Sequence, residues 1–97
     1  MAQFDVHRLG QGFVIDCQTG LLDQLASRFV VPLIPRAEAQ HVARRLNPVF
    51  EIDGAEYVML TQAAAAVRCT ELGAVVSSLA DRSIEITGAL DVLISGV

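Results

Sequence analysis

Three residues near the start of the chain have side chains suited to acid–base chemistry: Asp5, His7 and Arg8. A carboxylate, an imidazole and a guanidinium that converge on one point can supply an acid, a base and a cationic stabiliser. Apolar residues alternate loosely around these three, as in a half-buried strand, where side chains two positions apart share a face. Asp5 and His7 would then lie on one face and Arg8 on the other. We therefore expect a solvated face of a first strand rather than a catalytic group.

The other acidic residues do not pair convincingly for chemistry that needs two carboxylates. Asp53 precedes Gly54, and this dipeptide is a strong signal for a tight hairpin turn. Glu51 and Glu56 flank that turn and are better explained as cross-strand surface positions. Asp16 lies in an apolar run and has no neighbouring acid in the sequence. These positions give no indication of an acid–base pair.

The remaining candidates for chemistry are one histidine and two cysteines. We expect His41, beside Arg44 and Arg45, to lie on a solvated face. Cys17 and Cys69 have no metal-binding spacing, and both lie in apolar runs where a buried reduced thiol acts as a small hydrophobe. A disulfide between them is the alternative. With no phosphate-binding loop and no hydrolase motif, the sequence predicts no enzyme, no metal site and no cofactor.

The composition indicates a small protein that associates with itself. A chain of 97 residues predicts one domain, spanning 1–97, and 53% of its residues are hydrophobic. So small a body cannot bury them all, and a contiguous apolar surface patch usually marks an interface. We expect a homodimer with two-fold symmetry. The net charge of −4 argues against direct binding of nucleic acid, which needs a basic surface. Without a signal peptide or an apolar run long enough to span a membrane, the protein is expected to be cytoplasmic.

The pattern of apolar residues and turns predicts an α+β fold that is mainly β. Strand-like segments lie at 3–9, 13–17, 28–34, 49–52, 56–60 and 66–72. From them we expect an antiparallel sheet of about five strands, closed by one C-terminal helix. Pro32, inside the third segment, predicts an edge position or a bulge there. Single helical turns are expected at 63–66 and 74–79, and a helical turn or a mobile loop at 35–45.

The last stretch of the chain keeps an apolar pattern to its final residue. Asp81 or Ser83 could cap a helix there. Apolar residues then follow at helical spacing: Ile86, Leu90, Leu93, Ile94 and Val97. Because termini usually fray, a pattern that persists this far indicates that the end of the chain is a placed part of the molecule.

The order of these elements resembles the CcdB family of bacterial toxin–antitoxin toxins. The segments that are similar to the family's first three strands are Gln-Phe-Asp-Val at 3–6, Phe-Val-Ile-Asp-Cys-Gln at 13–18 and Arg-Phe-Val-Val-Pro-Leu at 28–33, with Leu-Leu-Asp at 21–23 between them. The stretch Arg-Leu-Asn-Pro-Val-Phe-Glu-Ile at 45–52 resembles the entry to the family's central hairpin. From Asp53 to Val97 the chain aligns without a gap.

This resemblance implies an SH3-like antiparallel barrel with a C-terminal helix, in a two-fold dimer. It also implies an activity: binding of the A subunit of DNA gyrase and trapping of the gyrase–DNA cleavage complex. A cognate antitoxin with a disordered binding segment would neutralise the toxin, and the pair would repress its own operon. The family's gyrase-contacting residues correspond to Ser95, Gly96 and Val97. We assign Leu93 and Ile94 to the dimer interface.

Two departures from the family pattern leave alternatives open. Ser95 stands where the family typically has a Trp anchor, and the turn at 10–12 is shorter than the family loop that helps engage the antitoxin. The chain could therefore be a working gyrase poison. It could instead be a CcdB-fold dimer that no longer poisons gyrase and serves as an antitoxin-binding or regulatory partner, or acts on another target. A third alternative is a ribonuclease of the related MazF type, which would use Asp5, His7 and Arg8.

Overall fold

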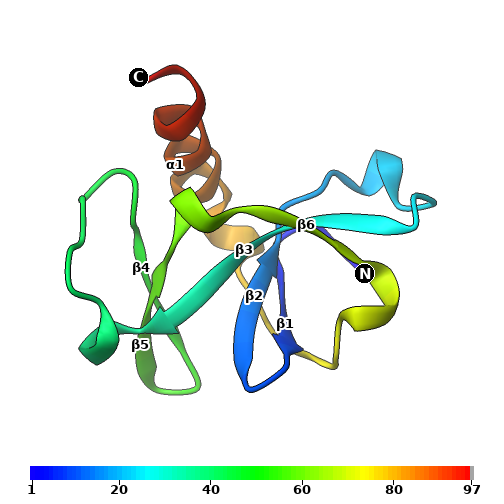
Figure 1. Cartoon of the computed structure of the whole chain (residues 1–97), viewed down its shortest axis with the longest axis horizontal. Coiled ribbons are helices and arrows are strands. Elements are labelled where there is room, and N and C mark those ends of the chain that lie inside the picture. Colours follow the sequence, from blue (N-terminus) through cyan, green and yellow to red (C-terminus); the bar gives the residue numbers. More distant parts are fainter. Residues whose placement is uncertain (97) are drawn as a thin grey trace.

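A computed structural model describes residues 1–96 and shows a curled antiparallel sheet with one helix packed against it (Figure 1). The described part of the chain has a seven-stranded sheet, with the strand order β4-β5-β3-β2-β1-β7 and with β6 paired to β3 outside that path. The strands are β1 (Asp5–Leu9), β2 (Gly12–Asp16), β3 (Ser27–Pro35), β4 (Val49–Ile52), β5 (Ala55–Met59), β6 (Ala65–Arg68) and β7 (Val75–Ser78). The helix α1 spans Ser83–Ser95. The predicted mainly β, SH3-like fold with a C-terminal helix is confirmed, but the expected number of strands was too low.

Both hairpins predicted from turn residues are present. β1 and β2 pair around the turn at 10–11, with Leu9 opposite Gly12. β4 and β5 pair around Asp53 and Gly54, whose φ angles of 52° and 81° are both positive. Two positive φ angles in a two-residue loop give the backbone twist that matches a right-handed strand pair. These hairpins are local in sequence, which is why turn chemistry alone predicts them.

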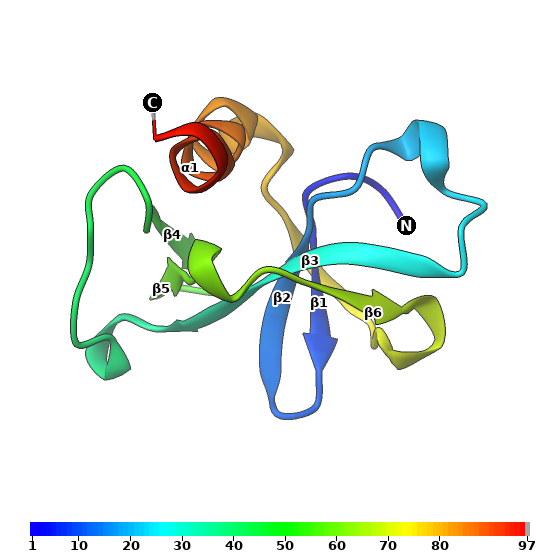
Figure 2. The same cartoon turned by 45° about the horizontal axis from the view of Figure 1, so that its top comes forward.

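The long strand β3 crosses the whole sheet and joins its two parts (Figure 2). On one side β3 pairs with β2. On the other side its first half pairs with β6 and its last three residues pair with β5. Pro32 lies between these two partners, and its carbonyl accepts a hydrogen bond from the Leu60 N–H at 2.9 Å. The prediction of an edge or a bulge at Pro32 was wrong, because the change of partner creates a position inside the sheet where no N–H is needed.

The segment after β5 differs from its sequence-based prediction. The single helical turn expected at 63–66 lies earlier, as a 3-10 turn over Thr61–Ala63, and the strand expected at 66–72 ends at Arg68. The helical turn expected at 74–79 was wrong, because this stretch forms β7 and pairs with β1. Its two valines favour a strand, and the open edge of β1 supplies the partner. That edge is about 70 residues away in the sequence, so a short local pattern carries little information about it.

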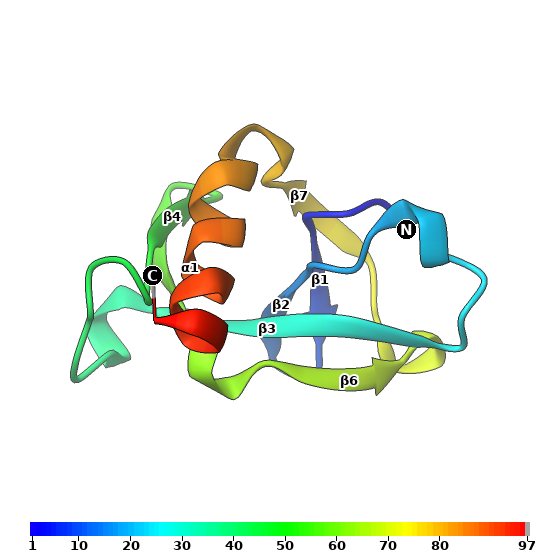
Figure 3. The ribbon, with the colours of Figure 1, turned by 90° about the horizontal axis from the view of Figure 1, so that it is seen from above.

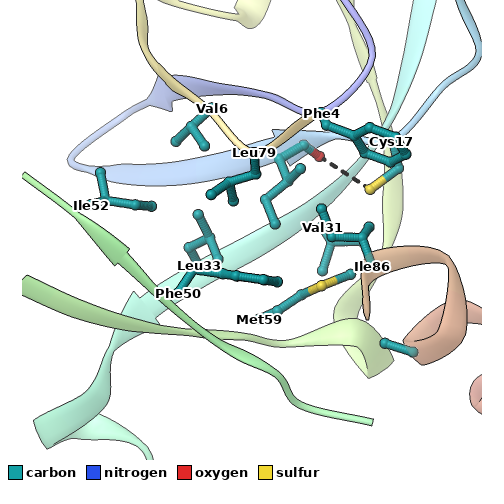
Figure 4. Packing of buried hydrophobic residues seen from close by; sticks show 12 residues of the cluster. Phe4, Val6, Cys17, Val31, Leu33, Phe50, Ile52, Met59, Leu79 and Ile86 are labelled. Carbon is teal, nitrogen blue, oxygen red and sulfur yellow. Dashed lines mark hydrogen bonds between the residues drawn. The ribbon is translucent and has the colours of Figure 1, made fainter. Parts of the chain in front are cut away.

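The hydrophobic core lies between the concave face of the sheet and α1 (Figure 4). The side chains that fill it come from both parts of the sheet and from the helix: Phe4, Val6, Ile15, Cys17, Val31, Leu33, Phe50, Ile52, Met59, Leu79, Ile86 and Ala89. Cys17 is among them, and its thiol contacts the Ile15 carbonyl oxygen at 3.7 Å. Both cysteines are free thiols, so the alternative of a disulfide is excluded. Cys17 is buried as expected, whereas Cys69 is only half-buried.

A buried ion pair connects β2 and β3. Arg28 Nη2 lies 2.7 Å from Asp16 Oδ2, and Arg28 Nε donates a hydrogen bond to the same oxygen at 2.9 Å. Both side chains are fully buried. The other carboxylate oxygen of Asp16 accepts a hydrogen bond from the Gln18 N–H at 3.1 Å. The sequence did not indicate this pair, because a carboxylate and a guanidinium twelve residues apart carry no motif.

Candidate functional site

The helix α1 lies across the sheet and presents its C-terminal end to solvent (Figure 3). Ile86 and Ala89 are fully buried in the core, and Leu90 packs against it. These residues recur every three to four positions, so one face of the helix is anchored and the opposite face is free. The remaining part of the helix is therefore held at a fixed angle to the sheet by its own buried face.

The start of α1 differs from the predicted start. Neither Asp81 nor Ser83 caps it, because a 3-10 turn over Ala80–Arg82 leads directly into α1. Arg82 instead pairs with Glu85 in the first helical turn, with Nη2 to Oε2 at 2.8 Å and a second contact between Nε and Oε1. The guanidinium carbon of Arg82 also lies 4.8 Å from the centre of the Phe50 ring. Hydrogen bonding from Arg82 lowers the pKa of the Glu85 carboxyl group.

The described end of α1 is ordered through Gly96. The Gly96 N–H donates a hydrogen bond to the Val92 carbonyl at 3.0 Å, and Gly96 has a φ of 77°. This left-handed conformation is a common end for a helix and suits glycine, which has no Cβ to clash. The Ser95 hydroxyl donates to the Asp91 carbonyl at 2.8 Å, so it is engaged by the helix itself. The helix therefore continues to Ser95, and the expectation that the final residue is placed falls on Val97, which lies outside the described residues.

The structure brings four of the five predicted site residues together at this end of α1. Leu93 is 44% exposed and Ile94 is 79% exposed, and Ser95 and Gly96 are also exposed. Val97, the fifth, lies outside the described residues. Two large apolar side chains next to a small polar one thus form an exposed tip, which we define as Leu93, Ile94, Ser95 and Gly96. An apolar cluster of this kind suits a protein partner better than a small molecule.

The comparison with protein families agrees with this architecture. A family model described as "CcdB protein" matches residues 3–96. The chain belongs to the CcdB family. CcdB proteins are toxins of toxin–antitoxin systems, and the match includes the whole sheet, α1 and the exposed tip.

In this CcdB-family chain the possible acid–base group does not assemble. His7 is only 2% exposed, so the expected solvated position was wrong. Its Nδ1 forms a hydrogen bond with the Gly73 carbonyl at 3.1 Å, because the loop before β7 covers that face of β1. Arg8 points elsewhere, with its guanidinium carbon 5.2 Å from the centre of the Phe13 ring, and Asp5 accepts a hydrogen bond from the Ala2 N–H. The three groups therefore share no point at which a substrate could react.

The other polar candidates are exposed, as expected. His41 lies in the loop before β4, and Glu51 lies directly opposite Glu56 on the exposed face of the β4–β5 hairpin. Burial, with a smaller contribution from the Asp16 charge, raises the pKa of the Cys17 thiol to about 12. A thiol that stays protonated at neutral pH is a poor nucleophile. Within residues 1–96, no group of three or more His, Cys, Asp or Glu side chains could hold a metal ion, and no helix is long and apolar enough to cross a membrane.

A feature that sequence reasoning missed lies on the other side of α1. A cleft separates the helix from the loop that precedes β4, and it is lined by Arg44, Arg45, Pro48, Glu85 and Gly88. The only sequence signal was the adjacent Arg44-Arg45 pair, which was interpreted as a solvated face. Both arginines are indeed exposed, but they face a cleft rather than open solvent.

Proposed function

We propose that this CcdB-family chain is a toxin that binds the A subunit of DNA gyrase and traps the gyrase–DNA cleavage complex. The observation that supports it is the end of α1, where Ser95 and Gly96 are exposed on a helix whose opposite face is anchored in the core. In the proposal, Ser95, Gly96 and Val97 meet gyrase. The protein acts by binding rather than by catalysis, and a cognate antitoxin with a disordered segment neutralises it.

The active unit is proposed to be a cytoplasmic homodimer, with Leu93 and Ile94 contributing to its interface. Each apolar side chain that moves from water into an interface contributes about 1.5–3 kcal/mol when fully buried. Replacing both residues with Asp should therefore convert the dimer to a monomer in sedimentation experiments. Ile84→Asp is the matched control, because Ile84 is 86% exposed at the other end of the same helix. Equal dissociation by the control would contradict the assignment.

One structural observation favours the second function, a CcdB-fold dimer that no longer poisons gyrase. The Ser95 hydroxyl is bonded to its own helix, and Ser offers little apolar surface to a partner. The Trp that typically stands at this position of the family could contribute about 2–4 kcal/mol as a central anchor. Its absence would weaken gyrase binding by roughly 30- to 1000-fold unless other contacts compensate.

The decisive assay measures linear DNA formed from supercoiled plasmid by the purified gyrase of the natural host. A working poison should produce linear DNA at micromolar protein, and none should form if poisoning has been lost. Ser95→Trp should then raise trapping strongly if the rest of the surface is competent. Ser95→Ala is the matched control, since it removes the hydroxyl without adding a ring. No gain from Ser95→Trp over Ser95→Ala would refute the view that one missing anchor limits the activity.

A further inference from the structure

The sheet has a second group of buried side chains on the face that points away from α1. Val6, Ile15 and Val31 point into the core beneath the helix, so the residues that alternate with them point to the opposite face. Five residues on that face are at most 4% exposed, and we call them the polar interior: His7, Val14, Asp16, Arg28 and Val30. The core beneath α1 is apolar, whereas the polar interior combines two valines with an imidazole and an ion pair.

His7 contributes a hydrogen-bond acceptor that has no donor. Its Nδ1 lies 3.1 Å from the Gly73 carbonyl oxygen. A carbonyl oxygen only accepts, so Nδ1 carries the proton, and Nε2 of the neutral ring is left as an acceptor. Nε2 is buried and has no hydrogen-bond partner within residues 1–96. A buried polar atom in this position costs free energy unless a donor reaches it.

Arg28 contributes a donor that has no acceptor. Its Nε and Nη2 both bind Asp16 Oδ2, and Nη2 also donates to the Gln18 carbonyl at 3.4 Å. Nη1 is buried as well, and no atom in the described part of the chain accepts a hydrogen bond from it. The ion pair with Asp16 therefore satisfies only one edge of the guanidinium group.

The register of the sheet places these two groups near each other. His7 is opposite Val14, and Asp16 lies two residues further along β2, so His7 and Asp16 are diagonal neighbours on one face. Such neighbours are about 7–8 Å apart, within reach of long side chains. The Arg28 guanidinium group is bound to Asp16, so its unpartnered donor and the unpartnered His7 acceptor belong to the same buried region.

The chemistry of the two atoms selects the molecule that can satisfy both. An anion could accept from Arg28 Nη1 but could not donate to His7 Nε2. A metal cation could bind Nε2 but would be repelled by the buried guanidinium charge. Water both donates and accepts, and buried waters in proteins commonly satisfy polar groups of this kind.

We propose that ordered water occupies the polar interior, where it donates a hydrogen bond to His7 Nε2 and accepts one from Arg28 Nη1. This water extends the contacts of the ion pair in β2 and β3 to His7 in β1. Through the His7 bond to Gly73, it also helps to hold the loop before β7 against the sheet. The site uses none of the residues proposed to meet gyrase, so either proposal can fail without the other.

The first test measures nuclear Overhauser effects between water and the His7 ring in the isotope-labelled full chain. The ring proton Hδ2 is adjacent to Nε2 and distant from the Nδ1 proton, so a contact there reports water at Nε2. A bound water should give an effect with the sign of a rigid contact, because it stays longer than the protein takes to tumble. The exposed His41 in the same sample is the matched control, and its ring should show no such long-lived contact.

The second test is a high-resolution crystal structure of the parent chain and two variants. Water should lie about 2.7–3.2 Å from His7 Nε2 and from Arg28 Nη1 in the parent. His7→Phe removes the acceptor without adding a polar atom, so the water beside position 7 should be lost. Arg8→Gln is the matched control, because the Arg8 side chain lies over the Phe13 ring on the other face, and the water should remain.

Any one of three results would contradict the proposal. The first is the lack of a long-lived water contact at a resolved His7 Hδ2 resonance. The second is a crystal structure in which a protein atom rather than water bonds to Nε2 or Nη1, or in which the same water remains in folded His7→Phe. The third is a set of ring nitrogen chemical shifts that place the only proton on Nε2, since Nε2 would then be a donor.

Discussion

Breaking the buried pair between Asp16 and Arg28 should remove much of the stability of this protein. Arg28→Leu leaves a fully buried carboxylate that keeps only the Gln18 N–H as a partner. Removing one member of a buried pair costs about 3–5 kcal/mol, because the remaining charge stays uncompensated. A domain of this size has a free energy of unfolding of only about 5–15 kcal/mol. At about 4–8 °C per kcal/mol, the melting temperature should fall by roughly 12–40 °C.

The assay is urea unfolding followed by far-UV circular dichroism, since the chain has no Trp for a fluorescence signal. The protein concentration is held fixed, because self-association would shift the midpoint of unfolding. Asp16→Asn added to Arg28→Leu should recover about 1–3 kcal/mol, because it removes the unpaired charge. Arg36→Leu, at an exposed position, should change stability by less than about 0.5 kcal/mol. A loss below about 1 kcal/mol for Arg28→Leu, or no recovery in the double variant, would refute the reasoning.

Three further predictions concern single positions. Cys17 should resist thiol reagents at pH 7, whereas half-buried Cys69 should react. The free energy of unfolding should fall as the pH rises from about 9 to about 12, because the Cys17 thiol loses its proton in the unfolded chain and keeps it in the folded one. A flat pH profile for Cys17→Ala beside a falling one for the parent chain would confirm this cause, and equal slopes would exclude it. Gly73→Ala should destabilise the protein by about 1–3 kcal/mol in thermal unfolding, since the added Cβ would lie 2.9 Å from the Arg8 carbonyl oxygen. An unchanged melting temperature would show that the loop before β7 can move away from β1. Glu56→Lys should stabilise the protein by about 0.2–1 kcal/mol, because the repulsion between residues 51 and 56 becomes an attraction. Added salt should reduce this gain, and Glu51→Lys should produce a gain of the same size.

The sequence predicted those elements whose causes are local. The β4–β5 hairpin follows from Asp53 and Gly54, whose positive φ angles few other pairs adopt readily. α1 follows from apolar residues at helical spacing, although Ile94 turned out to face solvent. The helical spacing alone could not show this exposure, because the width of the buried face depends on how much sheet the helix covers; only the assignment of Ile94 to a dimer interface implied it.

The features that were missed depend on residues far apart in the chain. β7 is a strand because β1 offers it an edge, and His7 is buried because the loop around Gly73 covers it. The cleft exists only where Arg44 and Arg45 come to face Gly88. A periodic pattern within one segment carries no information about contacts between residues that are distant in the sequence. The family resemblance placed the candidate tip at the end of α1, and the exposure of Leu93, Ile94, Ser95 and Gly96 came from the structure.

The pairing of β1 with β7 also affects how quickly this chain can fold. Asp5 is opposite Ser78, so closing the sheet brings together segments that lie about 70 residues apart in the sequence. The entropy of closing so long a loop must be overcome before that pairing gives any stabilisation. During synthesis the hairpins can form as they leave the ribosome, but β1 has to wait for its second neighbour until Ser78 has emerged. The exposed tip lies further along the chain still, so a surface proposed to poison gyrase is completed only after the fold that supports it.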